Sequence, residues 1–258
     1  MLLVMDVGNS QTVLGLFEAN KLRAHWRVTT AHYRTSDELR ILLTVLLQQE
    51  GVGVGDIRGC CISSVVPQLN MALQSVSEEA FGVTAVMVGP GIKTGLVLQC
   101  ENPKEVGADR IVNAVAAIEE HDGALIILDF GTATTFDAVT AKAEWRGGVI
   151  VPGVQLSASA LAERCAQLPS IDIVKPPTVI GRNTIMNFRS GLTYGYADMV
   201  DGLVRRMTEE MACDVTVIAT GGLAPVIAQV ATTIDHVDPF LTLKGLNTVY
   251  CKNERDPA

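Results

Sequence analysis

Aromatic and basic residues are both scarce in this sequence. Aromatics make up 5% of the 258 residues, so a packed core must come mainly from Val, Ile, Leu and Ala. Lys and Arg number 20 against 28 Asp and Glu, which gives a formal charge of −8. Binding to a nucleic-acid backbone relies on clustered Lys and Arg, so this charge argues against nucleic acid as the main ligand. Hydrophobic residues reach 48%, which excludes a disordered chain.

The sequence also lacks a long apolar run and a metal-type cysteine pattern. Residues 1–5 are apolar, but the run stops at Asp6 and is too short for a secretion signal. Residues 215–234 carry no charge, yet Gly221 and Pro225 interrupt them, so we expect a strand, a turn and a helix there. The six cysteines form no CxxC pair and have no His at ligand spacing. We therefore predict reduced thiols, no membrane segment and a cytoplasmic protein.

A repeat with a period of 123 residues organises the chain. The first copy spans residues 2–29 and the second spans residues 124–151. Each copy opens on an apolar strand that ends in Asp and passes through Gly, as Asp6-Val7-Gly8-Asn9 and as Asp129-Phe130-Gly131-Thr132. Two further strands follow in each copy, over 12–18 and 22–29 and over 133–139 and 144–151. Two copies of one unit predict a duplicated domain.

Helical and strand patterns alternate after each three-strand unit. Strands are expected over 59–65, 84–88 and 215–220. Helices are expected from residue 36 onward and over 68–80, 107–121, 154–166, about 184–211, 222–232 and 241–252. This alternation predicts an α/β chain with mixed sheets flanked by helices. We expect one domain over residues 1–115 and a second over residues 116–258.

The two glycine turns carry groups that suit a nucleotide phosphate chain. Each places a carboxylate, Asp6 or Asp129, at a strand end beside backbone N–H groups that glycine leaves accessible. Hydroxyls come from Ser10 and Thr12 in the first turn and from Thr132, Thr134 and Thr135 in the second. Carboxylates, hydroxyls and amides together suit a metal–nucleotide complex. One such turn alone favours a structural hairpin, whereas two at matched positions favour a phosphate site.

Asp109 and Arg110 open the helix expected over residues 107–121. Pro103 and Gly107 precede them in a loop. In the structural interpretation, Asp109 caps the helix and Arg110 is solvated. In the functional interpretation, Asp109 is a base with a cation beside it, near the backbone donors of a helix start. This stretch alone leaves both interpretations open.

Two later stretches have the same double interpretation. Thr184 precedes the long helix and can simply cap it, but glycines recur inside that helix at Gly191, Gly195 and Gly202. Glycine within a helix costs about 1 kcal/mol relative to Ala, which suggests close approach by another backbone or subunit. Residues 220–224 form a strand-to-helix turn that could accept a flat ligand ring.

These motifs together resemble the type III pantothenate kinase family. The segments that carry the resemblance are DVGNS at 6–10, ENPKEVGADRIVNAVAA at 101–117, DFGTATTFD at 129–137, GGVIVPG at 147–153, IGRNT at 180–184, SGLTYGY at 190–196 and ATGGLA at 219–224. The family belongs to the superfamily of acetate and sugar kinases, Hsp70 and actin. The resemblance implies duplicated ribonuclease-H-like (actin-like ATPase) domains. It also implies ATP-dependent phosphorylation of pantothenate to 4′-phosphopantothenate, the first step of coenzyme A biosynthesis.

The resemblance further implies a role for each matching residue. Asp109 would be the base on the substrate hydroxyl in an in-line phosphoryl transfer. ATP binding is implied for Asp6, Val7, Gly8, Asn9, Ser10, Gln11, Thr12, Val13 and Thr132. Pantothenate binding is implied for Cys100, Gly107, Ala108, Asp109, Arg110 and Thr184. Asp129 would hold a monovalent cation, K⁺ or NH₄⁺, and Asp6 would help to place Mg²⁺. The family also implies a homodimer with the substrate pocket at its interface.

Three positions depart from the usual family pattern. Ser10 replaces Thr, Arg182 replaces Lys, and Cys100 stands where an aromatic residue usually lines the substrate pocket. Cys100 is the feature that favours one alternative, a superfamily relative that phosphorylates another small alcohol. The other alternative is a non-catalytic ATP-binding transcriptional accessory factor. The joint presence of the three predicted site carboxylates argues against that second alternative.

Overall fold

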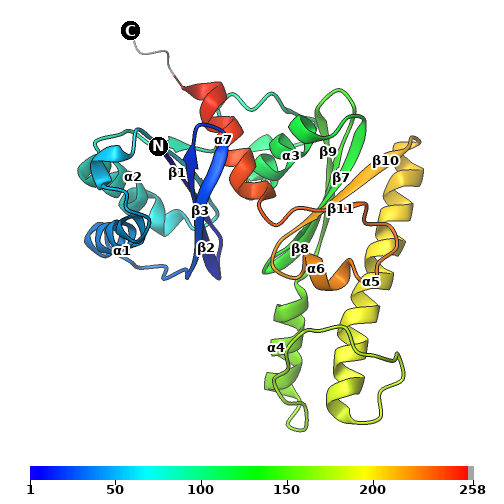
Figure 1. Cartoon of the computed structure of the whole chain (residues 1–258). Helices are drawn as coiled ribbons and strands as arrows, with labels where there is room; N and C mark the ends of the chain where they lie inside the picture. Colours follow the sequence, from blue (N-terminus) through cyan, green and yellow to red (C-terminus); the bar gives the residue numbers. More distant parts are fainter. Residues whose placement is uncertain (255–258) are drawn as a thin grey trace. The chain divides into compact units, whose positions relative to one another are not determined.

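Two mixed sheets, each in its own compact unit, form the frame of the molecule in a computed structural model that describes residues 1–254 (Figure 1). The first unit contains Met1–Leu96, Glu101–Ala116 and the chain from Leu241 onward. The second contains Val97–Cys100 and Ala117–Phe240. None of the helices in the described part of the chain combines the length and apolar content that a membrane crossing requires.

The first unit has a five-stranded sheet in the order β3-β2-β1-β4-β5. Its strands are β1 (Leu2–Val7), β2 (Gln11–Glu18), β3 (Lys21–Thr29), β4 (Gly59–Ser64) and β5 (Val86–Met87). Its helices are α1 (Ser36–Gln49), α2 (Pro67–Phe81), the start of α3 (Ala108–Glu120) and α7 (Leu241–Asn253), with short 3₁₀ turns η1 (Val54–Asp56) and η2 (Pro103–Glu105). β2 is antiparallel to β1 and β3, whereas β4 is parallel to β1 and β5.

The second unit has a six-stranded sheet in the order β11-β10-β7-β8-β9-β6. Its strands are β6 (Val97–Leu98), β7 (Ala124–Phe130), β8 (Ala133–Val139), β9 (Glu144–Pro152), β10 (Val215–Thr220) and β11 (His236–Val237). Its helices are α4 (Val154–Arg164), α5 (Thr184–Met211) and α6 (Ala224–Ile227).

The strand order confirms the duplication. Apart from β6, the second sheet repeats the order and the strand directions of the first, with β7 in the place of β1. The pairing of β2 with β3 passes over Arg23, and the pairing of β8 with β9 passes over Arg146, 123 positions later. A bulge conserved at one place in both copies is a feature that an accidental likeness would not share.

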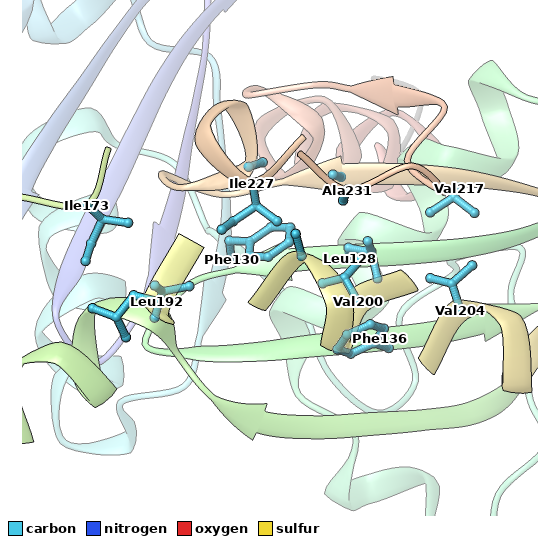
Figure 2. Packing of buried hydrophobic residues seen from close by; sticks show 14 of the residues in the cluster. Leu128, Phe130, Phe136, Ile173, Leu192, Val200, Val204, Val217, Ile227 and Ala231 are labelled. Atoms are coloured by element: carbon cyan, nitrogen blue, oxygen red, sulfur yellow. The ribbon is translucent and has the colours of Figure 1, made fainter. Parts of the chain in front are cut away.

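Each sheet is covered by helices that bury alternate strand residues. In the first unit, Met5 of β1 and Ile62 of β4 lie in one cluster with α1 and α2, which Figure 1 shows side by side. In the second, Val200 and Val204 of α5 lie in one cluster with Phe136 of β8 (Figure 2). Each such side chain contributes about 1.5–3 kcal/mol through burial. As the low aromatic content predicts, both cores consist mainly of aliphatic side chains, which pack around a few Phe rings.

The last helix differs from the predicted domain division. We assigned residues 116–258 to the second domain, but α7 packs on β1, β2 and β4 of the first. Two glycines permit the contact. A Cβ on Gly59 would overlap the Tyr250 ring, and a Cβ on Gly245 would overlap the Val112 carbonyl of α3. The C-terminal helix thus belongs to the first unit, and residues 97–100, which we expected in the first domain, belong to the second.

The helix predicted over 222–232 was wrong in length, since α6 has four residues. The chain continues in turns to residue 230, and Asp201 of α5 binds the two threonines that follow. Its carboxylate accepts hydrogen bonds from the backbone N–H and the hydroxyl of both Thr232 and Thr233, at 2.7–3.0 Å. These N–H groups are satisfied by a side chain distant in sequence, so the backbone does not need the helical ladder. The two-residue strands β6 and β11 were not predicted.

Candidate functional site

The first glycine turn joins β1 to β2 and contains most of the residues predicted to bind ATP. Asp6 and Val7 end β1, residues 8–10 form the turn, and residues 11–13 begin β2. The Gly8 N–H donates to the Gln11 carbonyl at 3.1 Å, and the Thr30 N–H donates to the Ser10 carbonyl at 3.1 Å. The turn is therefore closed by its own backbone and supported by the residue that follows β3.

The second glycine turn, between β7 and β8, repeats this arrangement with one residue fewer. The Gly131 N–H donates to the Ala133 carbonyl at 3.0 Å, and the Gly153 N–H donates to the Thr132 carbonyl at 3.0 Å. Gly153 follows β9 as Thr30 follows β3, and the two lie 123 positions apart. Both turns are thus closed by backbone hydrogen bonds at matched positions, at the ends of equivalent strands.

Two glycines enclose the second turn closely. A Cβ on Gly153 would overlap the Gly131 and Thr132 carbonyl oxygens. Gly221, with a φ of +90°, follows β10, and a Cβ there would lie 2.7 Å from Oδ1 of Asp129. Only glycine fits at either place without displacing the turn. The half-buried Asp129 carboxylate is consequently held against backbone on the β10 side.

Asp109 lies in the first turn of α3. Burial raises the pKa of its carboxyl group, and the Arg110 N–H at 2.8 Å from Oδ1 and the Arg110 charge oppose this only in part. A Cβ on Gly107 would overlap Oδ1, so the glycine is what lets the carboxylate fold back over the helix start. A carboxylate with a raised pKa at a half-buried position has the character of a proton acceptor.

The remaining predicted substrate residues divide between the units. Gly107, Ala108 and Arg110 lie with Asp109 at the start of α3 in the first unit. Cys100, half-buried after β6, and Thr184, exposed at the first position of α5, belong to the second. The described structure therefore groups four of the predicted pantothenate residues on one element and leaves two elsewhere.

The position of Thr184 is fixed by the chain before it. Asn183 caps α5 by accepting a hydrogen bond from the Met186 N–H at 2.9 Å. Thr193 and Tyr194 of α5 each donate to carbonyls of the preceding segment, on Val174 and on Pro176, at 3.3 Å. The interpretation of Thr184 as the cap of this helix is therefore wrong, because Asn183 is the cap and Thr184 is the exposed first residue of α5.

Comparisons with known proteins test the family resemblance. The sequence profile of the type III pantothenate kinase family matches residues 2–206. The chain belongs to this family. A curated type III pantothenate kinase from Bacillus cytotoxicus is 51% identical over 253 residues, which cover 98% of this chain and 97% of the relative. The family resemblance predicted from the motifs is confirmed.

Solved structures share the fold at low sequence identity. A Campylobacter jejuni protein described as a Baf family transcriptional activator has a TM-score of 0.59 and 17% identity, over 97% of this chain and 98% of that chain. A Listeria monocytogenes protein described as an N-acetylmannosamine kinase has a TM-score of 0.56 and 10% identity, over 98% and 99%. These likenesses concern the fold alone, and they confirm the predicted actin-like ATPase and sugar-kinase architecture with two mixed sheets.

The donor groups at the two turns fit cations that are shared with a nucleotide. In residues 1–254 no three His, Cys, Asp or Glu side chains gather to hold a metal by themselves. Mg²⁺ is commonly held by one or two carboxylates together with substrate phosphates, and Asp6 beside the first glycine turn offers one such carboxylate. Beside Asp129, the buried hydroxyl of its cross-strand neighbour Thr135 has no hydrogen-bond partner among the described residues. This oxygen is available to a cation or its water.

A cavity of about 190 Å³ lies elsewhere in the second unit. Arg146 at the β9 bulge and Met207, Glu210 and Met211 near the end of α5 are among its lining residues. None of the predicted site residues lines it. The cavity therefore does not contribute to the assignment of the site.

Gly153 and Ser63 were not among the predicted site residues, and both lie beside the turns. Gly153 could have been found by applying the 123-residue period to the end of the third strand, since it matches Thr30. Ser63 could have been noticed as a hydroxyl at the end of the apolar run Cys60-Cys61-Ile62. Neither residue type is distinctive without the strand pairing.

Proposed function

We propose that this chain transfers the γ-phosphoryl group of ATP to the primary hydroxyl of pantothenate, with Asp109 as the base. Family membership and 51% identity to a curated enzyme make the chain an ATP-dependent pantothenate kinase of coenzyme A biosynthesis that works with a divalent metal. The observation that supports the assignment of the base is the half-buried Asp109 carboxylate, whose pKa is raised by burial at the start of α3.

The proposed chemistry asks little covalent work of the protein. In a loose phosphoryl-transfer transition state the attacking hydroxyl keeps its proton until late, so a carboxylate is a sufficient acceptor. A raised pKa makes Asp109 a stronger base than an exposed Asp. We assign Arg110 to an anionic oxygen of the substrate or of the transferring group, because guanidinium binds such oxygens with directed hydrogen bonds.

The first turn is assigned to ATP and its divalent metal. Backbone N–H groups of the turn and the Ser10 hydroxyl would contact phosphate oxygens. Asp6, at the end of β1, would share Mg²⁺ with those oxygens, and the metal would neutralise charge on the phosphates. The ATP-binding set of this turn is Asp6, Val7, Gly8, Asn9, Ser10, Gln11, Thr12 and Val13.

In the second unit we assign Thr132 to ATP and Asp129 to a monovalent cation, K⁺ or NH₄⁺. The close approach of Gly221 to Oδ1 of Asp129 supports a fixed carboxylate there. The unpartnered hydroxyl of Thr135 supports a further oxygen donor on the neighbouring strand. One carboxylate with neutral oxygen donors carries a single negative charge, which matches the charge of a monovalent cation.

Pantothenate is assigned to Cys100, Gly107, Ala108, Asp109, Arg110 and Thr184. We further propose a homodimer in which Thr184 reaches the pocket of the other subunit. The surface of α5 supports this, because a Cβ added at Gly191 or Gly195 would have no other atom within 4 Å, so both glycines face open space. Nearby Val179 and Ile180 are also exposed, at 61% and 85%. Exposed apolar and glycine surface of this kind is typical of a helix that packs against a second chain.

Family membership disfavours the two alternatives. A kinase for another small alcohol rests on Cys100 alone. The solved structure that is described as a transcriptional activator shares only the fold with this chain, at 17% identity. Complementation of a strain without pantothenate kinase separates the regulator from the enzyme. The proposal also includes a cytoplasmic location, which the six free cysteines support.

The test is the conversion of pantothenate to 4′-phosphopantothenate by the purified chain, followed by mass spectrometry and by ADP release. Asp109→Asn should lower kcat by about 10²–10⁴-fold, the usual contribution of a general base. Asp122→Asn, an exposed carboxylate just after α3, is the matched control and should keep full activity. Equal activity of Asp109→Asn and Asp122→Asn would remove Asp109 from the mechanism. Turnover with other alcohols but not with pantothenate would overturn the substrate.

A further inference from the structure

A second hydroxyl lies beside the carboxylate of the first turn, on the neighbouring strand. Ser63 of β4 pairs in register with Asp6 of the parallel strand β1. In-register neighbours on adjacent strands are about 4.8 Å apart and direct their side chains to the same face. Met5 and Ile62, the residues before them, both face the α1 and α2 core, so Asp6 and Ser63 both lie on the opposite face.

Ser63 is fully buried and its hydroxyl makes no hydrogen bond within residues 1–254. Its exposed fraction is 0%, as for Cys60, Cys61 and Ile62 before it. The Ser63 Oγ has no hydrogen-bond partner among the described residues. An unsatisfied buried hydroxyl costs stability, and an apolar residue such as the preceding cysteines would avoid that cost. A hydroxyl retained at such a place points to a use outside packing.

The second unit has a hydroxyl at the equivalent place. Thr220 of β10 pairs in register with Asp129 of the parallel strand β7, and it is 2% exposed. The preceding positions differ when the strands are aligned on this pair, since residues 59–62 are Gly-Cys-Cys-Ile and residues 216–219 are Thr-Val-Ile-Ala. The repeat therefore retains a small hydroxyl beside each carboxylate while its packing residues change.

We propose that Ser63 is a positioning residue that orients the Asp6 carboxylate toward the divalent metal of the bound nucleotide. This rests on the proposed role of Asp6. The hydroxyl makes no hydrogen bond to Asp6 in the described structure, but rotation about its Cα–Cβ bond would let it donate to one carboxylate oxygen when the metal binds the other. Donors that orient a metal-binding carboxylate commonly change metal affinity by about 10–100-fold when they are removed.

The experiment measures ADP affinity by calorimetry with and without Mg²⁺, so that the readout does not depend on turnover. In the native protein Mg²⁺ should strengthen ADP binding. In Ser63→Ala that gain should shrink by about tenfold, and the Mg²⁺ concentration for half-maximal rate should rise by a similar factor. Thermal unfolding of Ser63→Ala should stay the same or move to higher temperature, since an unsatisfied hydroxyl has been removed.

Two further variants separate positioning from packing. Ser77→Ala is the matched control, because Ser77 is also 0% exposed but its hydroxyl donates to the Leu73 carbonyl at 2.9 Å inside α2. It should lose stability and keep the native Mg²⁺ effect. Ser63→Thr keeps the hydroxyl and introduces the residue found at Thr220, so it should restore the Mg²⁺ effect.

Each outcome has one meaning. An unchanged Mg²⁺ effect in folded Ser63→Ala, or a change confined to the KM for pantothenate, would overturn the inference about Ser63. A folded Ser63→Thr that behaves like Ser63→Ala would overturn it as well. Asp6→Asn distinguishes a failure of this inference from a failure of the proposed function. If Asp6→Asn keeps the Mg²⁺ effect, the metal role of Asp6 fails; if Asp6→Asn loses the effect and Ser63→Ala retains it, only the role of Ser63 fails.

Discussion

The two glycine turns share one backbone plan and differ in how closely their surroundings enclose them. In the first unit, Thr30 and Ser64 occupy the places that Gly153 and Gly221 occupy in the second. The first turn therefore tolerates side chains where the second permits only glycine. The first turn also has one residue more. This difference agrees with the roles proposed above, in which the first turn takes a divalent metal with phosphate and the carboxylate of the second turn takes a monovalent cation.

The largest expected effect comes from placing a methyl group in the enclosed turn. Gly153→Ala and Gly221→Ala should each lower the free energy of unfolding by about 3 kcal/mol or more, through overlap with backbone and, at Gly221, through a positive φ. Thr30→Ala and Ser64→Ala, at the equivalent places, should each cost about 1 kcal/mol, the value of a lost hydrogen bond.

Urea unfolding of the four variants measures this difference. The paired design controls for the substitution, because each variant ends with Ala at a position related by the repeat. Equal losses in both units would show that the turns are enclosed alike, and the structural contrast between them would then be wrong.

A smaller effect is expected on the dependence of the rate on Mg²⁺ and K⁺, the cations proposed for the first and second turns. Asp6→Asn should raise the Mg²⁺ concentration needed for half-maximal rate by about 10–100-fold and leave the K⁺ dependence as it was. Asp129→Asn should do the reverse. Initial rates in a matrix of Mg²⁺ and K⁺ concentrations measure both. If either variant shifted both dependences to the same extent, the assignment of one cation to each turn would not hold.

The smallest effect on stability concerns one carboxylate with a shifted pKa in each unit, Asp201 in the second and Asp109 in the first. Burial would raise the pKa of Asp201, but hydrogen bonds from Thr232 and Thr233 outweigh it and lower the pKa. Asp201 therefore stabilises the fold above the pKa of an unfolded Asp, and this contribution disappears as pH falls through the lowered folded pKa. At neutral pH Asp201→Asn should cost about 1–2 kcal/mol.

Asp109 should show the opposite sign. Its folded pKa is raised by burial, so the ionised group costs stability once the pH is above that pKa, and the cost vanishes below the pKa of an unfolded Asp. Asp109→Asn should thus unfold at a higher temperature than the native chain at neutral pH and at the same temperature in acid. Thermal unfolding across a pH series measures both variants, and a destabilised Asp109→Asn at neutral pH would contradict the cause given for its pKa.

Much of the fold followed from local pattern. The strands of both three-strand units, the start of the helix at residue 36 and the long α5 were predicted within about two residues, because alternating or helical apolar spacing is strong there. The helix over 222–232 was not, since only residues 224–227 are helical; beyond the turns that follow, Asp201 takes up the N–H groups of Thr232 and Thr233 from about 30 residues away along the chain. Likewise β6 and β11 exist only because a neighbouring strand pairs with them.

The site shows the same division between local and distant causes. By itself the sequence determined the duplication, the two turns with Asp6 and Asp129, the acidic residue at the start of α3, and through their combined motifs the family. These are features of local chemistry and spacing, which the chain carries whether folded or not. Only the tertiary structure decided that α7 completes the first sheet, that Gly153 and Gly221 enclose the second turn, and that Ser63 lies beside Asp6. The reason is physical: strand pairing and close backbone approach bring together residues whose separation along the chain gives no signal.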